Sequence, residues 1–168
     1  MAFTVEPLNK GHDRKPFQCG QPDLDDWFQH RASQDDKRNV ARVFVASNDE
    51  HGVIGFYCLS SFTLTIGDLP DEIGRKLPHY EAIPAALIGR LARDIRVHGK
   101  GIGELLLADA VRRIISASRT LAVFAIVVEA KDAAASAFYE GFGFRPFPQH
   151  PHRLFLLTST ASTAFERL

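Results

Sequence analysis

The sequence of residues 87–110 is LIGRLARDIRVHGKGIGELLLADA, in which an apolar strand, a glycine-rich turn and a helix are predicted in succession. In the strand, residues 87–95, three of the five positions that share one face are large and apolar. From residue 104 onward, apolar side chains recur at the spacing of one helix face. Three glycines at alternate positions, starting with Gly99, lie in the turn. Backbone N–H groups at a helix start have no helical partners, so the arrangement predicts an anion-binding turn.

The glycine run differs from two common nucleotide-binding motifs. It lacks the Gly-Lys-Ser/Thr ending of a P-loop, and its Gly-x-Gly-x-Gly spacing is not that of a dinucleotide fingerprint. By itself, such a turn also suits an ordinary helix start. The run Arg96-x-x-Gly99-x-Gly101, followed by Gly103 and a leucine-rich helix, resembles the acetyl-CoA pyrophosphate loop of the GNAT N-acetyltransferases. The resemblance implies acetyl-CoA as co-substrate.

The composition is that of an ordinary globular protein, with 45% hydrophobic and 24% charged residues. We expect a single domain, residues 1–168. Twenty basic and twenty acidic residues cancel, so net charge does not argue for a nucleic-acid partner but allows local patches. Cys19 and Cys58 have no metal-ligand spacing, and we expect no metal site. Without a signal peptide or an apolar run of spanning length, the chain is expected to be cytoplasmic, with no membrane contact.

Further elements are predicted on both sides of residues 87–110. Strands are predicted at residues 3–8, 42–46, 53–66, 121–130 and 153–158. One helix is predicted from the spacing of the apolar residues Leu24, Trp27 and Phe28, and a second at 133–140. A helical turn is predicted at 71–77 and a loose helix at 159–168. Asp23 and Asp132 are predicted to cap the helices that follow them. Helices that alternate with more numerous strands favour an α/β fold, with a mixed, mostly antiparallel sheet flanked by helices. The proline-rich residues 67–84 are expected to cover or flank a substrate cleft.

A second motif follows the strand predicted at 121–130. The run Asp132-x-x-Ala135-x-x-Phe138-Tyr139-x-x-x-Gly143-Phe144 resembles the C-terminal signature of GNAT enzymes. In that family, an Asn commonly meets the pantetheine at the position of Asp132, and a Tyr often lies beside the cofactor sulfur at that of Tyr139. The resemblance implies that Tyr139 is the general acid for the leaving thiolate, which a phenol can protonate. The alternative is a core tyrosine packed beside Phe138.

The GNAT resemblance also implies where acetyl-CoA binds. The strand around residues 91–93 would separate from the strand at 121–130, so that its backbone could pair with the pantetheine amides and polarise the thioester carbonyl. The residues implied in cofactor binding are Leu91, Ala92, Arg93, Arg96, His98, Gly99, Lys100, Gly101, Ile102, Gly103, Asp132 and Phe138.

Five stretches narrow the resemblance further. They are F-x-C-G-x-x-x-L-D-x-W at 17–27, ARVFV at 41–45, GFY-x-LS at 55–60, IPA-x-L-x-GRLA-x-D at 83–94 and HG-x-G at 98–101. Together they are similar to the acetyltransferase toxins of bacterial toxin–antitoxin operons. This resemblance implies acetylation of the α-amino group of aminoacyl-tRNA, a homodimer, and a small ribbon-helix-helix antitoxin. Arg93 departs from the pattern, because an apolar residue is frequent there.

Basic side chains are candidates for binding the RNA acceptor. Lys37, Arg38 and Arg42 lie together in sequence, and Arg90 lies near the cofactor strand. For Lys37 and Arg38, the alternative is a solvated helix end.

The general base is not identified by the sequence. Glu129 is a candidate, or else a surface group. An aminoacyl ester amine is less basic than a lysine, so it needs less help to lose its proton. Two other functions stay open: a GNAT enzyme that acetylates a small-molecule amine or a protein, and an inactive family member that only binds acetyl-CoA.

Overall fold

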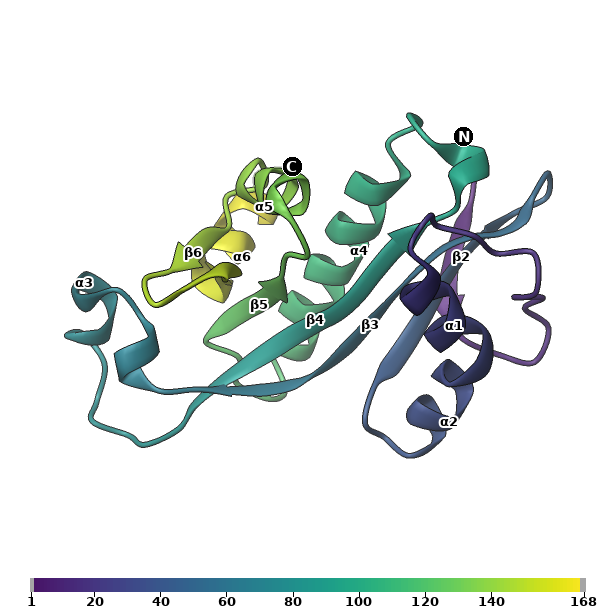
Figure 1. Ribbon diagram of the computed structural model, residues 1–168. Coiled ribbons are helices and arrows are strands. Elements are labelled where there is room, and N and C mark those ends of the chain that lie inside the picture. The colour runs from purple at the N-terminus through teal and green to yellow at the C-terminus, as the bar shows by residue number, and fades with distance from the viewer. Residues whose placement is uncertain (1, 167–168) are drawn as a thin grey trace. The chain divides into compact units, whose positions relative to one another are not determined.

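In the computed structural model, which describes residues 2–166, seven strands form one sheet in the order β1-β2-β3-β4-β5-β7-β6 (Figure 1). The strands are β1 (Thr4–Pro7), β2 (Arg42–Asn48), β3 (Gly52–Leu64), β4 (Ile83–Arg93), β5 (Ala125–Glu129), β6 (Arg145–Phe147) and β7 (His150–Leu157). The β4–β5 pair is parallel, whereas the β1–β2, β2–β3, β5–β7 and β6–β7 pairs are antiparallel. The predicted mixed, mostly antiparallel sheet is confirmed.

Six α-helices and two short 3-10 helices connect these strands within residues 2–166. They are α1 (Pro22–His30), α2 (Ala32–Lys37), η1 (Ile66–Asp68), α3 (Asp71–Gly74), η2 (Ile95–Val97), α4 (Ile102–Ala117), α5 (Ala133–Glu140) and α6 (Thr158–Glu166). None of the helices in the described chain is long and apolar enough to cross a membrane. The loose helix predicted at 159–168 is α6, and the last two residues of that prediction lie outside the described residues.

The chain divides into two compact units. The first contains the chain up to Ser60 together with Gly89–Ala110, and the second contains Ser61–Ile88 together with the chain from Val111 onward. β3, β4 and α4 each pass from one unit into the other, because their bounds enclose the division points.

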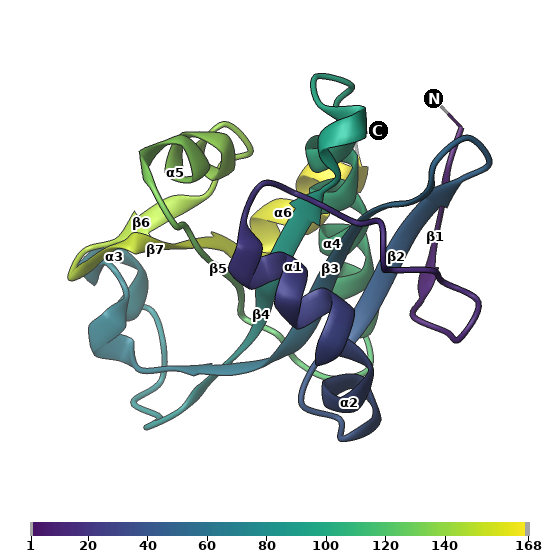
Figure 2. The same ribbon diagram turned by 45° about the vertical axis from the view of Figure 1, so that its right-hand side comes forward.

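In the first unit, α1 and α2 cover one face of β2 and β3 (Figure 2). Phe28 stacks on Phe56 of β3 with ring centroids 4.1 Å apart, and both rings are fully buried. The predicted cap at Asp23 is wrong. The helix begins one residue earlier, at Pro22, where a missing N–H costs no hydrogen bond. Asp25 instead ties the preceding loop, because its Oδ1 accepts a hydrogen bond from the Cys19 N–H at 2.9 Å.

Helix α4 approaches β3 closely in the same unit. A Cβ added to Gly55 would lie 2.8 Å from Cδ1 of Leu106 and 3.0 Å from the carbonyl oxygen of Ala92. Glycine is therefore required at this point of β3. The buried Tyr57 hydroxyl, two residues later, donates a hydrogen bond to Asp109 of α4. These contacts fix the N-terminal half of α4 against the sheet.

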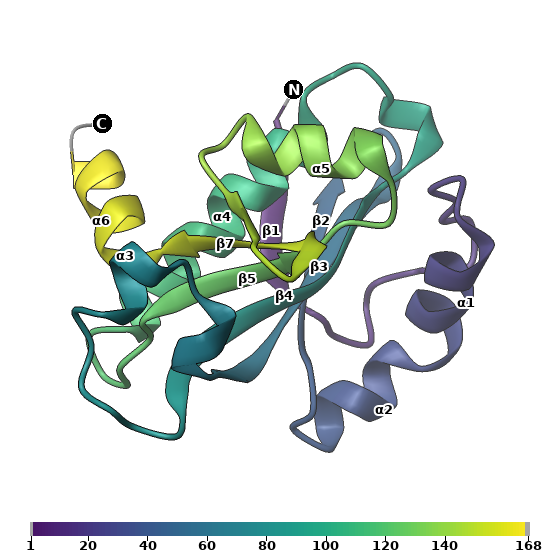
Figure 3. The same cartoon turned by 60° about the vertical axis from the view of Figure 1, so that its left-hand side comes forward.

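In the second unit, β5 lies between β4 and β7, and α5 packs against β7 (Figure 3). β5 is shorter than the strand predicted at 121–130, because the chain pairs with its neighbours only from residue 124 onward and Leu121 is 74% exposed. β7 begins earlier than the strand predicted at 153–158, and β6 was not predicted. Strand β6 has only three residues, so its stability comes from pairing with β7 rather than from its own pattern.

The proline-rich residues 67–84 hold α3, which is shorter than the predicted helical turn at 71–77. Glu72 of α3 accepts a hydrogen bond from Arg145 of β6 at 2.8 Å, so this excursion is tied to the β6–β7 hairpin. A role in covering a substrate cleft stays a prediction.

Candidate active site

The glycine-rich turn lies between the end of β4 and the start of α4. Gly99 and Gly101 have φ angles of +78° and +76°, in the left-handed region that glycine adopts most easily. The first residue of α4, Ile102, is fully buried and anchors the helix start. Gly103 lies within the first turn of α4. The predicted order of strand, glycine turn and helix is confirmed, but β4 ends at Arg93 rather than at residue 95, and α4 begins at Ile102 rather than at residue 104. The geometry is that of a turn whose backbone N–H groups can bind an anion.

An ion pair with a buried carboxylate fixes the conformation of this turn. Asp94 is 1% exposed, and its carboxylate lies 2.9 Å from Nε of Arg96. It also accepts hydrogen bonds from the backbone N–H of Arg96 at 2.9 Å and of Gln18 at 3.1 Å. Burial opposes the charged form, but the hydrogen bonds and the charge of Arg96 outweigh it and lower the pKa of Asp94.

The side chain of Arg96 is directed at the protein itself. Besides Asp94, its guanidinium donates hydrogen bonds to the backbone carbonyls of His51 and Val53, each at 3.1 Å. Arg96 was predicted among the cofactor-binding residues. The structure gives its side chain a positioning role for the loop.

The loop also carries three further basic side chains. Arg93, at the end of β4, donates a hydrogen bond to Nδ1 of His98, and Lys100 is exposed. Arg93 is half-buried and His98 is exposed. His98 and Lys100 lie on the turn and Arg93 lies at the strand end before it, and the charges of Arg93 and Lys100 favour a bound phosphate.

Strand β4 runs past the end of β5. The parallel ladder joins Ala85–Ile88 to Ala125–Val128, after which β5 ends at Glu129 while β4 continues to Arg93. In this register, the last four residues of β4 extend beyond β5. Leu91 and Ala92, both predicted to bind the cofactor, belong to this extension. Separation of the two strands was predicted here.

Tyr139, the predicted general acid, is on α5 in the second unit. Its ring is 8% exposed and packs edge-on against Phe138 at 5.3 Å and Phe144 at 5.7 Å. Burial raises the pKa of Tyr139 to about 12. The phenol is therefore protonated at neutral pH and able to donate its proton, and the packing also satisfies the alternative of a core residue.

The start of α5 confirms a predicted cap. Oδ1 of Asp132 accepts a hydrogen bond from the Ala135 N–H at 2.8 Å. Asp132 thus has a structural task that needs no cofactor. Phe138 is half-buried, with its ring 5.5 Å from that of Phe142.

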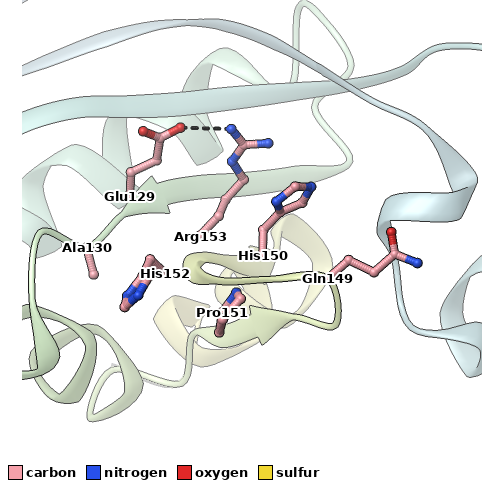
Figure 4. Close-up of a pocket in the computed structure, with 7 residues that line it drawn as sticks. All are labelled: Glu129, Ala130, Gln149, His150, Pro151, His152 and Arg153. Atoms are coloured by element: carbon pink, nitrogen blue, oxygen red, sulfur yellow. Dashed lines mark hydrogen bonds and ion pairs between the residues drawn. The ribbon is translucent and has the colours of Figure 1, made fainter.

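A polar cavity of about 320 Å³ opens at the end of β5 (Figure 4). It is lined by Glu129, Ala130, Gln149, His150, Pro151, His152 and Arg153. Oε1 of Glu129 accepts a hydrogen bond from Arg153 at 3.1 Å, and Figure 4 shows the two side chains facing one another. The Arg153 guanidinium also lies 5.2 Å from the ring centroid of Phe62. Glu129 is therefore paired with Arg153 while its side chain is 56% exposed, and a role as general base stays a prediction.

The two histidines of this cavity, His150 and His152, are exposed, as expected of a solvated pair. No group of three or more potential metal-ligating side chains that could hold an ion occurs in the described part of the chain.

The side chains predicted to bind RNA differ in their exposure and in their pairing with other side chains of the protein. Lys37 and Arg38 are exposed at the end of α2. Arg42 pairs with Asp36 at 2.6 Å and donates to Asn39 at 2.6 Å, so its charge is partly neutralised by the protein.

Arg90, on the extension of β4, has a partner that the sequence did not reveal. Its guanidinium carbon lies 4.1 Å from the ring centroid of Trp27, which is on α1. Trp27 and Arg90 are far apart in the sequence, and no local sequence pattern predicts their contact.

Comparison with known proteins decides the family. A family model described as an acetyltransferase (GNAT) domain matches residues 39–146, which include the glycine-rich turn and Tyr139. The chain belongs to the GNAT acetyltransferase family. As a GNAT enzyme, it is an acetyl-CoA-dependent N-acetyltransferase, as its loop and second motif predicted.

Two curated relatives resemble this GNAT enzyme over nearly their whole length. One is a probable toxin TacT of Sinorhizobium fredii, 34% identical over 165 residues that cover 93% of this chain and 91% of the relative. The other is a tRNA-acetylating toxin of Mycobacterium tuberculosis, 35% identical over 154 residues that cover 92% of this chain and 91% of the relative.

Two solved structures of the toxin AtaT have the same fold as this chain. AtaT complexed with acetyl-methionyl-tRNAfMet matches with a TM-score of 0.90 and 28% identity, covering 98% of this chain and 99% of that chain. AtaTR bound with acetyl-CoA matches with a TM-score of 0.85 and 27% identity, covering 97% and 98%. The predicted GNAT-like architecture is confirmed.

Proposed function

We propose that this GNAT enzyme acetylates the α-amino group of aminoacyl-tRNA and acts as a toxin that blocks translation. The observation that carries the proposal is the 35% identity to a tRNA-acetylating toxin along 92% of the chain. The fold match to AtaT in complex with an acetylated, charged tRNA supports the same substrate class.

The glycine-rich turn is the proposed pyrophosphate site. Backbone N–H groups of Gly99, Gly101, Ile102 and Gly103 would bind the phosphate oxygens, and Arg93, His98 and Lys100 would flank them. The Lys100 N–H is already bonded to the Val97 carbonyl oxygen at 3.3 Å. The ion pair of Asp94 and Arg96 would position the turn. The backbone of Leu91 and Ala92, on the part of β4 that extends past β5, would pair with the pantetheine amides.

In the proposed reaction, the neutral α-amine attacks the thioester carbonyl carbon. The new C–N bond forms, the C–S bond breaks, and Tyr139 donates its proton to the departing sulfur. The proton lost by the nitrogen goes to solvent. This route suits an aminoacyl ester, because its amine is less basic than a lysine side chain.

We further propose that the whole chain works as one acetyltransferase domain, since β3, β4 and α4 are shared by both compact units. The solved structure of the AtaT Y144F mutant toxin bound to the C-terminus of the antitoxin AtaR supports an antitoxin as partner of this chain. A ribbon-helix-helix antitoxin, a homodimer and action in the cytoplasm complete the proposal, by resemblance to the toxin family.

The deciding experiment is the transfer of labelled acetyl from acetyl-CoA to a panel of charged tRNAs, with uncharged tRNA and small amines as controls. We expect label on at least one charged tRNA, and growth arrest on expression that a hydrolase of N-blocked aminoacyl-tRNA relieves. Transfer to small amines or proteins alone would support those substrates instead. Binding of acetyl-CoA without transfer to any amine would indicate an inactive family member.

A further inference from the structure

A stack of planar groups runs from the core of the first unit to Arg90. The rings of Phe28 and Phe56 stack at 4.1 Å with an interplanar angle of 6°, and Phe56 stacks on Trp27 at 5.9 Å and 30°. Arg90 then lies over Trp27 at 4.1 Å. The three rings are buried, whereas Arg90 is half-buried, so the guanidinium is the outer end of the stack.

This outer end is held in place by its neighbours. Nε1 of Trp27 donates a hydrogen bond to Oδ2 of Asp35 at 2.9 Å, which fixes the plane of the indole. Trp27 is 5% exposed and cannot move without disturbing the aromatic core. Stacking on the indole leaves a guanidinium one further face and its N–H donors. A rigid, cationic plane is therefore presented at the protein surface.

The position of this plane on β4 connects it to the acceptor. Arg90 belongs to the extension of β4 past the end of β5, two residues before Ala92. Under the proposed function, the pantetheine arm pairs with this part of the strand. The acceptor amine must reach the thioester, so the 3′ end of the tRNA that carries it must pass near this strand.

We propose that the outer face of Arg90 stacks on an unpaired base at the aminoacylated 3′ end of the tRNA. This inference rests on the proposed function and adds how that site binds its substrate. Single-stranded bases are recognised by stacking on aromatic rings or on guanidinium planes. The same group also attracts the adjacent phosphates by its charge. Stacking tolerates any base, so it suits an end that tRNAs share.

The test is Arg90→Lys, which keeps the positive charge and removes the plane. The acceptors are 3′-O-aminoacyl-adenosine and the methyl ester of the same amino acid, two esters that offer the same amine with and without a base. We expect wild-type protein to prefer the aminoacyl-adenosine in kcat/KM. Arg90→Lys should reduce that preference by about fivefold or more, the loss typical of one base stack, through a higher KM for the aminoacyl-adenosine. The methyl ester, which carries no base to stack, should lose less kcat/KM than the aminoacyl-adenosine does.

Arg119→Lys is the matched control, because Arg119 is exposed just after α4 and lies outside the proposed site. Melting temperature and acetyl-CoA affinity of both variants establish that fold and cofactor site are intact. An unchanged preference in Arg90→Lys, while wild type acetylates charged tRNA, overturns the stacking role and leaves the proposed function standing. A wild-type protein that acetylates neither charged tRNA nor aminoacyl-adenosine overturns both.

Discussion

Asp94 and Arg96 are joined by three hydrogen bonds: Oδ1 of Asp94 accepts from both the backbone N–H and Nε of Arg96, each at 2.9 Å, and Oδ2 accepts from Nη2 at 3.0 Å. The same guanidinium reaches the backbone of Val53 at the start of β3, and the N–H of Asp94 donates to the carbonyl of Ile54 at 2.8 Å. The proposed phosphate loop is thus fastened to a neighbouring strand before any ligand binds. A site that is shaped in advance pays less ordering entropy when it binds.

This pair predicts a specific dependence of stability on pH. The pKa of Asp94 is lowered in the folded protein, so its charge stabilises the fold above the unfolded-state pKa of about 3.9. That contribution is lost as the pH falls below this value and through the lower folded-state pKa. Asp94→Asn should lower the free energy of unfolding at pH 7 by on the order of 2 kcal/mol, and the difference from wild type should shrink in acid.

Urea denaturation at pH 7 and at pH values below 4 measures this difference. Glu72→Gln is the control, because Glu72 pairs with Arg145 at 2.8 Å in an exposed position and should have little effect at either pH. A difference between Asp94→Asn and wild type that stays constant over the whole pH range would show that the carboxylate charge is not what stabilises the loop.

The elements around this loop could be predicted from sequence, because their patterns are local. The helical spacing of α4 follows directly from burial on one face. For β4, the strand itself was predicted but not its buried face. Ile88 and Ala92 are buried, whereas Leu87 and Leu91 of the predicted face are half-buried. The loop was found because glycine is needed where φ is positive, as at Gly99 and Gly101. The cap at Asp132 was found because a capping carboxylate acts within three residues.

The features that the sequence did not show depend on distant parts of the chain. Arg96 matches a cofactor motif, but only the fold shows that its guanidinium turns toward Asp94 and the backbone of β3. An aspartate two residues earlier was the signal that could have suggested this pair. The contact between Trp27 and Arg90 joins α1 to β4 and has no local signature. Strand β6 exists because β7 pairs with it.

Substitutions at Gly101 should separate backbone strain from charge. With φ at +76°, Gly101→Ala and Gly101→Asp are both strained, but only the aspartate adds a carboxylate beside the proposed pyrophosphate. We expect both variants to bind acetyl-CoA more weakly than wild type, and Gly101→Asp to bind at least about tenfold more weakly than Gly101→Ala. Calorimetric titration with acetyl-CoA measures the two affinities. If the two variants bound acetyl-CoA with equal affinity, the pyrophosphate would not bind at this turn.

Charge reversal at the end of α2 should weaken the use of tRNA. Lys37 and Arg38 are exposed, and each removed contact with a phosphate reduces the salt dependence of binding. Lys37→Glu with Arg38→Glu should raise the KM for charged tRNA and flatten its dependence on salt, while acetyl-CoA affinity stays unchanged. Arg119→Glu changes the net charge by −2, half of the −4 of the double variant, at an exposed position outside the proposed interface, and serves as the control per unit charge. Equal effects per unit charge would indicate a general field rather than a binding surface.

Gly55 should tolerate no side chain, because α4 and the backbone of β4 approach it on one side. A Cβ there would lie 2.8 Å from Leu106 and 3.0 Å from the Ala92 carbonyl oxygen, so either α4 or β4 must shift. We expect Gly55→Ala to destabilise the protein by about 1–3 kcal/mol and to weaken acetyl-CoA binding, since the displaced helix carries the phosphate loop. Gly89→Ala is a milder comparison, because its Cβ would lie 3.4 Å from the Cys58 sulfur. Thermal unfolding and titration with acetyl-CoA give both values, and a Gly55→Ala protein as stable as wild type would contradict this account.

Tyr139→Phe tests the acid directly, because it keeps the packing against Phe138 and Phe144 and removes only the hydroxyl. If the phenol protonates the departing thiolate, fold and acetyl-CoA affinity change little, since its contribution arises mainly as the C–S bond breaks. The single-turnover transfer rate should fall by roughly 10²-fold or more. Burial raises the pKa of Tyr139 to about 12, so the acid form persists across the alkaline range and wild-type kcat should not decline through loss of this proton between pH 8 and about 10. A core role predicts the opposite: Tyr139→Phe would transfer acetyl at a near wild-type rate, and only Tyr139→Ala, which opens a cavity, would lower the melting temperature.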